Sequence, residues 1–205
     1  KRGKLPIVAG GTGFYIQSIV DNISLPEVPP NAKLRQELGK KSVTELFKIF
    51  KKLDSKRAKE IDALNPHRLI RAIEIAKYLG QVPALKKEQP YDALQIGLTI
   101  DFSELEKKIA QRLTKRLKQG VIAEVTKLHT SGVSWKRLES FGLEYAFIAQ
   151  FLQNKISKQK MLDDIKTASL KYAKRQMTWF KKDERIIWIT KPTEAKKLIR
   201  RFLET

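Results

Sequence analysis

The sequence predicts an α/β fold in which a small parallel sheet carries mostly helical additions. Two apolar runs of strand type, at residues 94–100 and 185–189, lie among long stretches with helical spacing. A third run, at residues 5–9, leads through a glycine-rich turn into a helical segment, which is the strand–loop–helix order of parallel sheets. With 41% hydrophobic residues in a chain of 205, a sizeable core is also expected.

Charge is the most informative feature of the composition. Lysine and arginine together number 42 against 22 aspartates and glutamates, which leaves a net charge of +20. Such a surplus indicates a polyanionic partner, with nucleic acid as the first candidate and an anionic membrane surface as the second. No apolar run approaches the roughly 18 residues of a membrane span, so a membrane protein is not expected.

The chain has no cysteine and two histidines, His67 and His129. Disulfides, zinc–thiolate sites, thiolate nucleophiles and histidine-based metal clusters are therefore excluded, and a Ser-His-Asp triad is not favoured. The composition fits a reducing, cytoplasmic location. Because an apolar run begins within four residues of Lys1, we expect the chain to be the C-terminal part of a longer protein.

Three prolines within residues 26–30 indicate a subdomain boundary. Three helices are expected after it, over residues 31–39, 42–53 and 54–64. Asn31 is the predicted cap of the first helix, and Ser42 with Glu45 forms a predicted capping box for the second. These short, strongly charged segments predict a small helical insertion.

Helical spacing covers most of the remaining chain. The expected helices are 66–80, 104–119, 122–129, 135–152, 158–181 and a closing helix from residue 193. Ser103 and Glu106 form a predicted capping box for the helix over 104–119. We therefore divide the chain into residues 1–23 as part of the α/β core, 24–64 as the helical insertion, and 65–205 as the remainder of the core with C-terminal helices.

A glycine-rich loop, Gly10-Gly11-Thr12-Gly13, joins the first predicted strand to its helix. Backbone N–H groups at such a junction form an anion site, and glycines allow a phosphate to approach closely. The pattern matches neither GxxxxGK[ST] nor GxGxxG. Taken alone, it favours a tight strand-to-helix turn over a phosphate site.

Basic residues gather in three further places. In the run His67-Arg68-Leu69-Ile70-Arg71, two arginines three residues apart share one helix face, which suits either a phosphate clamp or an ordinary solvated face. Arg112 stands three residues after Ile109 and directly before Leu113, so it could lie at the edge of the buried helix face and point into a cleft. The segment 172–180 interleaves aromatic residues with Lys174 and Arg175, which suits nucleic-acid contact, although such aromatics more often belong to a core.

Three stretches resemble those of tRNA dimethylallyltransferases, the tRNA isopentenyltransferase family. They read VAGGTGFYI at residues 8–16, NPHRLIRAIEI at 65–75 and YAKRQMTWF at 172–180. A QRL…G…EV stretch over residues 111–125 agrees in order and spacing. The last of the three stretches is the most specific, and the resemblance covers essentially the whole chain.

The resemblance implies a partial P-loop-kinase-like parallel-sheet core, of the nucleotide- and ATP-binding type, with a helical insertion that grips the anticodon stem-loop of tRNA. It implies transfer of a dimethylallyl group from dimethylallyl diphosphate to the exocyclic amine of the adenosine 3′ of the anticodon, with release of diphosphate. Mg²⁺ is the implied cofactor, and a cytoplasmic monomer that binds no membrane is expected.

Residue roles follow from the same resemblance. Thr12 is expected to line the channel in which the amine meets the diphosphate, with Gly10, Gly11 and Gly13 beside it as substrate-binding residues. Arg112 is expected to neutralise the diphosphate as it leaves. The expected tRNA-binding residues are Arg35, His67, Arg68, Leu69, Ile70, Arg71, Lys174, Arg175 and Gln176. No residue is assigned as a metal ligand.

The chain also departs from the family pattern. The family's phosphate loop and general-base aspartate belong to a segment N-terminal to Lys1, so this chain alone is expected to be inactive. Glu139 and Glu144 stand at positions that are basic in relatives, and Leu170 at one that is often arginine, which weakens the case for RNA contact there. The alternative is a non-enzymatic RNA-binding module that retains the basic helical surfaces. A small-molecule kinase fragment would need a GK[ST] loop, which the sequence lacks.

Overall fold

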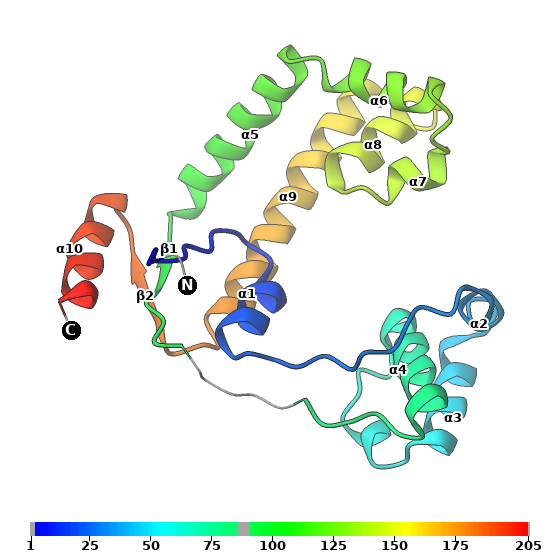
Figure 1. Ribbon diagram of the computed structural model, residues 1–205. Helices are drawn as coiled ribbons and strands as arrows, with labels where there is room; N and C mark the ends of the chain where they lie inside the picture. The colour runs from blue at the N-terminus through cyan, green and yellow to red at the C-terminus, as the bar shows by residue number, and fades with distance from the viewer. Residues whose placement is uncertain (1–2, 86–90, 205) are drawn as a thin grey trace. The chain divides into compact units, whose positions relative to one another are not determined.

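The computed structural model describes residues 3–85 and 91–204 (Figure 1). The chain forms two compact units, one of residues 14–92 and the other of residues 1–13 together with 93–205. We call them the helical unit and the sheet unit. Helix α1 (Gly13–Val20) starts where the first stretch of the sheet unit ends. No helix of the described residues is long and apolar enough to cross a membrane.

The helical unit is built on α2 (Ala32–Leu38), α3 (Val43–Leu53) and α4 (Pro66–Leu79). The predicted caps are confirmed. The Asn31 side chain accepts a hydrogen bond from the Leu34 amide, and Ser42 and Glu45 form the full capping box of α3. These side chains satisfy backbone N–H groups that a helix leaves without partners at its first turn.

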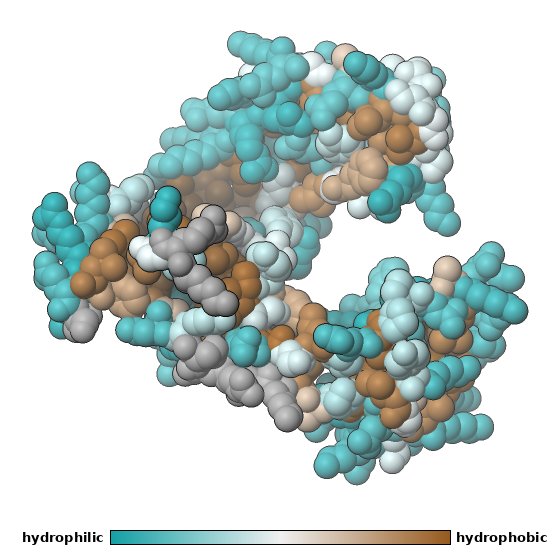
Figure 2. Space-filling model, viewed as in Figure 1, coloured by the Kyte–Doolittle hydropathy of each residue, from teal (hydrophilic) through white to brown (hydrophobic). Residues whose placement is uncertain are grey.

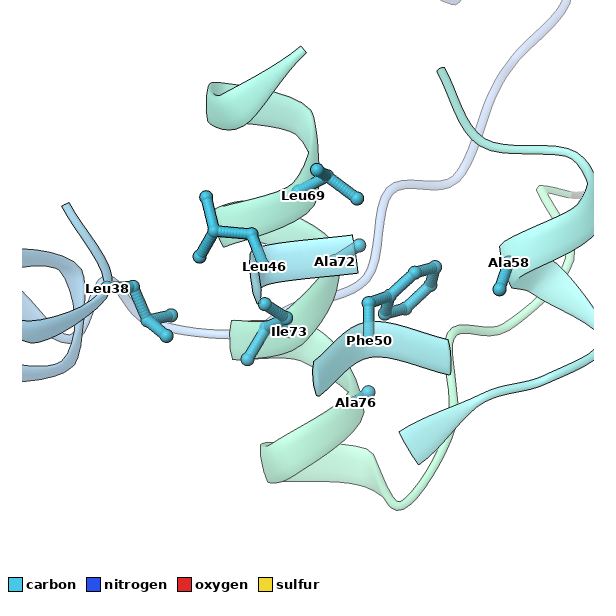
Figure 3. Packing of buried hydrophobic residues seen from close by; sticks show 8 residues of the cluster. All are labelled: Leu38, Leu46, Phe50, Ala58, Leu69, Ala72, Ile73 and Ala76. Atoms are coloured by element: carbon cyan, nitrogen blue, oxygen red, sulfur yellow. The ribbon is translucent and has the colours of Figure 1, made fainter. Parts of the chain in front are cut away.

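Helices α3 and α4 enclose the core of this unit. Leu46 and Phe50 from α3 meet Leu69 and Ile73 from α4, and all four side chains are at most 1% exposed (Figure 3). Because α4 contributes half of these residues, it belongs to the same compact unit as the helices before it. The boundary between the two compact units therefore lies after α4, whereas the boundary predicted from the sequence lies before it, at residue 64.

The predicted helix over residues 54–64 is wrong as a regular helix. Within it only Arg57–Lys59 (η1) is helical, as a short 3-10 turn. The Asp54 carboxylate accepts hydrogen bonds from the Arg57 amide at 2.9 Å and the Val82 amide at 2.9 Å. Aspartate bonds of this kind compete with helical backbone bonds, and here they fold the segment back toward the residues that follow α4.

The sheet unit contains the predicted parallel strands, β1 (Gln95–Leu98) and β2 (Ile186–Ile189). They pair in register from Gln95 opposite Ile186 to Leu98 opposite Ile189. The α/β class with a small parallel sheet is thus confirmed. The helices of the unit are α5 (Phe102–Lys118), α6 (Val121–Thr130), α7 (Trp135–Glu139), α8 (Leu143–Leu152), α9 (Lys158–Phe180) and α10 (Pro192–Leu203).

The predicted strand at residues 5–9 is wrong: among the described residues this segment pairs with no strand. A strand requires backbone partners, and here the side chains of Leu5 and Ile7 are 55% and 85% exposed. The helix predicted over 135–152 is interrupted between α7 and α8, where Gly142 has a φ of 141°. The N-cap of α5 is Asp101, whose side chain accepts a hydrogen bond from the Ser103 backbone amide. The capping box predicted from Ser103 and Glu106 is therefore wrong.

Helix α9 is held by the core of its unit. Met161 and Ile165, on its N-terminal half, pack fully buried against Leu113 of α5, Val125 of α6 and Ile148 of α8. Figure 2 shows hydrophilic residues over much of the visible outer surface of α5 and of the helical unit, with hydrophobic residues between the helices. The C-terminal half of α9 extends beyond this core toward β2 (Figure 1).

Candidate functional site

The glycine loop lies on the C-terminal half of α9. The Gln176 side-chain amide donates a hydrogen bond to the Gly11 carbonyl oxygen at 2.7 Å, between residues 165 positions apart. A Cβ added at Gly11 would stand 2.1 Å from Gln176 Nε2, and one at Gly13 would stand 2.2 Å from Trp179 Cδ1. A side chain at Gly13 would collide with the Trp179 ring, whereas one at Gly11 would displace the flexible Gln176 amide from its bond to the loop.

Thr12 lies between these two glycines and its side chain is exposed. Gly10 is also exposed, and a Cβ added there would have no described heavy atom within 4 Å. One side of the loop is therefore packed on α9 while the other is open to a ligand. The structure brings together the loop and Gln176, two features that were predicted separately.

Arg112 lies on α5 beside the buried residues Ile109 and Leu113, and its own side chain is exposed. Within residues 3–85 and 91–204 it makes no ion pair. Arg116, one turn later, does: its guanidinium is 3.3 Å from Glu144 and 3.5 Å from Glu124. Arg112 thus has an uncompensated charge available to an anion. No hydrogen bond joins it to the glycine loop among the residues that the structure describes.

Two predicted RNA-binding cations, Lys174 and Arg175, are exposed on α9. The Arg175 guanidinium carbon lies 5.7 Å from the centroid of the Tyr172 ring, which is within cation–π range. Neither cation makes an ion pair with a carboxylate of the described chain. Both charges are consequently free to meet an external polyanion.

In the helical unit, Arg35 of α2 and Arg71 of α4 converge on the buried carboxylate of Glu74. Arg35 donates to Glu74 through Nε at 2.9 Å and through a terminal nitrogen at 2.7 Å, while Arg71 donates to Oε2 of the same group. The backbone N–H of Asn31 donates a further hydrogen bond to Glu74 Oε1 at 2.7 Å. The Arg35 hydrogen bonds, helped by those of Asn31 and Arg71, outweigh desolvation and lower the pKa of Glu74 to about 2.

This cluster fixes the two arginines and leaves part of each in solvent, since their side chains are 44% and 37% exposed while that of Glu74 is 2% exposed. Arg71 also donates to the Val28 carbonyl oxygen at 3.0 Å, which ties the segment before α2 to α4. The two arginines that were predicted as RNA contacts are thus held as a pair. Sequence reasoning missed Glu74, although it is the single acid of α4 and stands three residues after Arg71, on the same helix face.

The rest of the run at residues 67–71 divides by exposure. His67 and Arg68 are exposed, and Arg68 lies 3.5 Å from Asp62 in an ion pair. Ile70 is half-buried and the Leu69 side chain is fully buried in the core. Because the Leu69 side chain is packed inside the core, it cannot contact a ligand.

Glu139 and Glu144, for which the resemblance left RNA contact in doubt, have partners inside the sheet unit. Glu144 pairs with Arg116, and Glu139 accepts from the Gln153 side chain at 3.2 Å and lies 3.9 Å from Lys155. The described residues bring together no three carboxylate or imidazole side chains that could hold a metal ion. None of them is therefore assigned as a Mg²⁺ ligand.

Comparison with known proteins places this geometry in context. Residues 1–183 match the family model described as IPP transferase. The chain is 40% identical over 187 residues to tRNA dimethylallyltransferase 2 of Trichlorobacter lovleyi, covering 90% of this chain and 61% of that protein. It is 43% identical over 201 residues to tRNA dimethylallyltransferase 2 of Treponema denticola, covering 93% and 67%. The chain thus spans roughly three fifths to two thirds of these relatives.

Solved structures give the same picture. The full-length tRNA isopentenylpyrophosphate transferase of Bacillus halodurans superposes with a TM-score of 0.63 at 28% identity, over 99% of this chain and 67% of that one. A eukaryotic dimethylallyltransferase acting on tRNA shares the fold, with a TM-score of 0.67 at 23% identity, over 94% and 53%. The fold seen here, with its small sheet and many helices, is similar to both.

Proposed function

The chain belongs to the IPP transferase family, and on that premise we propose that its protein transfers a dimethylallyl group from dimethylallyl diphosphate to the exocyclic amine of the adenosine 3′ of the anticodon in tRNA. The amine nitrogen forms a bond to the allylic carbon, the bond from that carbon to the diphosphate oxygen breaks with its electron pair, and the amine releases a proton. The observation that carries the proposal is the family match over residues 1–183.

Two exposed groups of the sheet unit suit this chemistry. Thr12 presents a hydroxyl on the open side of the glycine loop, where a polar group can orient the amine and the diphosphate. Arg112 offers a guanidinium without a carboxylate partner in the described chain, which suits the negative charge that grows on the leaving diphosphate. Because an amine inside a base stack cannot reach the allylic carbon, the adenosine must be extruded before it reacts.

The RNA partner is supported by charge and exposure. The net charge of +20 needs a polyanion, and Lys174 and Arg175 on α9 are exposed cations without ion-pair partners in the described chain. In the helical unit, the pair Arg35 and Arg71 suits a phosphate, as do the exposed His67 and Arg68. Together with the family, these cations support the anticodon stem-loop of tRNA as the partner. We propose no contact with a membrane.

Mg²⁺ is proposed as the cofactor because the chain belongs to this family. No described residue is assigned as its ligand, and no step of the reaction is derived from it. A cytoplasmic monomer is proposed in the same way. The chain spans 61% of the length of its relative from Trichlorobacter lovleyi, so the whole reaction is proposed for the protein and not for this chain alone.

The deciding experiment is prenyl transfer by the full-length gene product. Labelled dimethylallyl diphosphate is incubated with an anticodon stem-loop that carries adenosine 3′ of the anticodon, and label in the RNA is counted. A stem-loop with purine riboside at that position lacks the amine and is the matched control. Label that requires adenosine and is lost in Thr12→Ala supports the enzyme. Tight binding without label would favour an RNA-binding module.

The RNA surface has its own test. Arg175→Ala is expected to weaken stem-loop binding and to lower the slope of log K against log salt by about one, the effect of losing one phosphate contact. Lys166→Ala removes another exposed cation from the same helix, outside the 172–180 motif, and is the control. If Arg175→Ala left the slope unchanged, the motif would serve packing and not RNA binding.

A further inference from the structure

We propose that Gln176 and Trp179 are positioning residues that seat the glycine loop on α9 and thereby aim Thr12 at the reacting atoms, so that Gln176 acts on the loop and not on RNA. This inference rests on the proposed function for the role of Thr12, but the seat itself stands on geometry alone. It changes the role of Gln176, which the family resemblance assigns to tRNA contact.

The seat has two points of contact on one helix face. Gln176 and Trp179 are three residues apart, so their side chains lie one above the other along α9. Gln176 Nε2 bonds to the Gly11 carbonyl oxygen at 2.7 Å, and the Trp179 ring occupies the space beside Gly13. Thr12 is the residue between the two points. Its backbone is therefore held from both sides.

The fit leaves little room for the loop to move. A Cβ at Gly13 would fall 2.2 Å from the Trp179 ring, and one at Gly11 would fall 2.1 Å from Gln176 Nε2 and push that amide away. Among the described residues, the Gln176 bond is the hydrogen bond that ties residues 10–12 to α9. Helix α9 is buried in its own unit as far as Ser169, which is 6% exposed, and the loop packs on the turns that follow.

The geometry of Gln176 argues against a role in RNA contact. Its side chain is half-buried and one N–H of its amide is bound to the loop, whereas Lys174 and Arg175 next to it are exposed. A reaction between two bound substrates depends on the reacting groups being held in a productive geometry, and small displacements lower its rate steeply. Loss of the seat should therefore lower kcat and leave RNA affinity unchanged.

The sharpest variant is Gln176→Glu in the full-length protein, because it keeps the shape and replaces the donor NH₂ group by an acceptor oxygen opposite the Gly11 carbonyl. We expect kcat at saturating stem-loop to fall by about 10- to 100-fold. Because the new carboxylate also repels RNA phosphates, Kd is read in Gln176→Met, which removes the donor without adding a charge and should keep the Kd of the stem-loop within about twofold of wild type. Below the pKa of the new carboxyl, its protonated form can donate again, so the variant should regain activity relative to wild type as the pH falls.

Two further variants separate seating from RNA contact. Gly11→Ala disturbs the same contact from the loop side and leaves every side chain of α9 intact, so it should reproduce the loss of kcat. Arg175→Ala, one residue away on α9, should instead raise Kd for the stem-loop. If Gln176→Met raised Kd and kept kcat at saturation, Gln176 would be an RNA contact and the proposal would be overturned.

A readout without catalysis makes the proposal independent of the reaction. Amide hydrogen exchange of a peptide covering residues 8–16 is measured by mass spectrometry in wild type, Gln176→Glu and Lys166→Ala. Faster exchange in Gln176→Glu alone supports the seat, and equal exchange in all three overturns it. If the wild-type protein transferred no prenyl group, the proposed function would fail while this measurement still decided whether α9 holds the loop.

Discussion

Replacing Glu74 by glutamine is expected to destabilise the helical unit by about 2 kcal/mol at pH 7. The carboxylate of Glu74 lies between Arg35 and Arg71 and also accepts from the Asn31 amide, so it links α2, α4 and the segment before them. Glutamine keeps the size of the side chain but carries no charge. The two guanidinium groups would then repel each other without compensation.

The magnitude follows from the pKa of Glu74, which the bonds from Arg35 and its neighbours lower from 4.5 to about 2. A change of that size corresponds to about 3 kcal/mol in favour of the ionised carboxylate in the folded state. Because the arginine side chains are 44% and 37% exposed, solvent screens part of the interaction, and we reduce the expected loss to about 2 kcal/mol.

The pH dependence gives a second, independent check. A carboxyl whose folded pKa is lowered contributes stability above its unfolded pKa, and this contribution is lost as the pH falls from 4.5 toward about 2. Urea unfolding of wild type and Glu74→Gln is therefore compared at pH 7 and pH 3, and at pH 3 the gap should shrink to about half or less. Glu37→Gln, an exposed carboxylate on α2, is the control. Equal stability of Glu74→Gln and wild type at pH 7, or a gap that ignores pH, would refute the reasoning.

Two further stability predictions concern the two units. Phe50→Ala empties a site that is 1% exposed and should cost about 3 to 5 kcal/mol in urea unfolding; Tyr78→Ala, at 62% exposed, should cost less than about 0.5 kcal/mol. Tyr145→Phe removes the hydroxyl that donates to Glu124 and should cost about 1 kcal/mol near neutral pH. That hydrogen bond and burial raise the pKa of Tyr145, so its contribution is present below the ordinary tyrosine pKa of about 10 and is lost as the pH rises through the folded value. A Tyr145→Phe deficit that persisted at high pH would contradict this assignment.

Much of the fold was predictable from local patterns. The starts of two helices could be predicted from Asn31, Ser42 and Glu45, because an N-cap hydrogen bond joins residues only three positions apart. The strands at Gln95–Leu98 and Ile186–Ile189 were predictable from short apolar runs bounded by polar residues. The same local reading failed at residues 5–9, because an apolar run becomes a strand only if another strand pairs with it.

The candidate site was predictable as a set of residues and not as an arrangement. The motifs at 8–16, 65–75 and 172–180 are visible in the sequence, and the family resemblance that they carry led to Thr12, Arg35 and Arg175 as candidates. Their partners were not visible. That Glu74 holds Arg35, or that Gln176 binds Gly11 across 165 positions, depends on how distant elements pack.

The amino-acid sequence was thus sufficient for the class of fold, the basic charge, the helix limits set by caps and the family. These are properties of composition or of contacts within one or two turns, which a chain carries before it folds. Folding determined which cations are paired with carboxylates, which are left exposed, and why a glycine stands beside the Trp179 ring. Those outcomes depend on close packing between residues far apart in the chain, where a single methyl group decides whether two elements can touch.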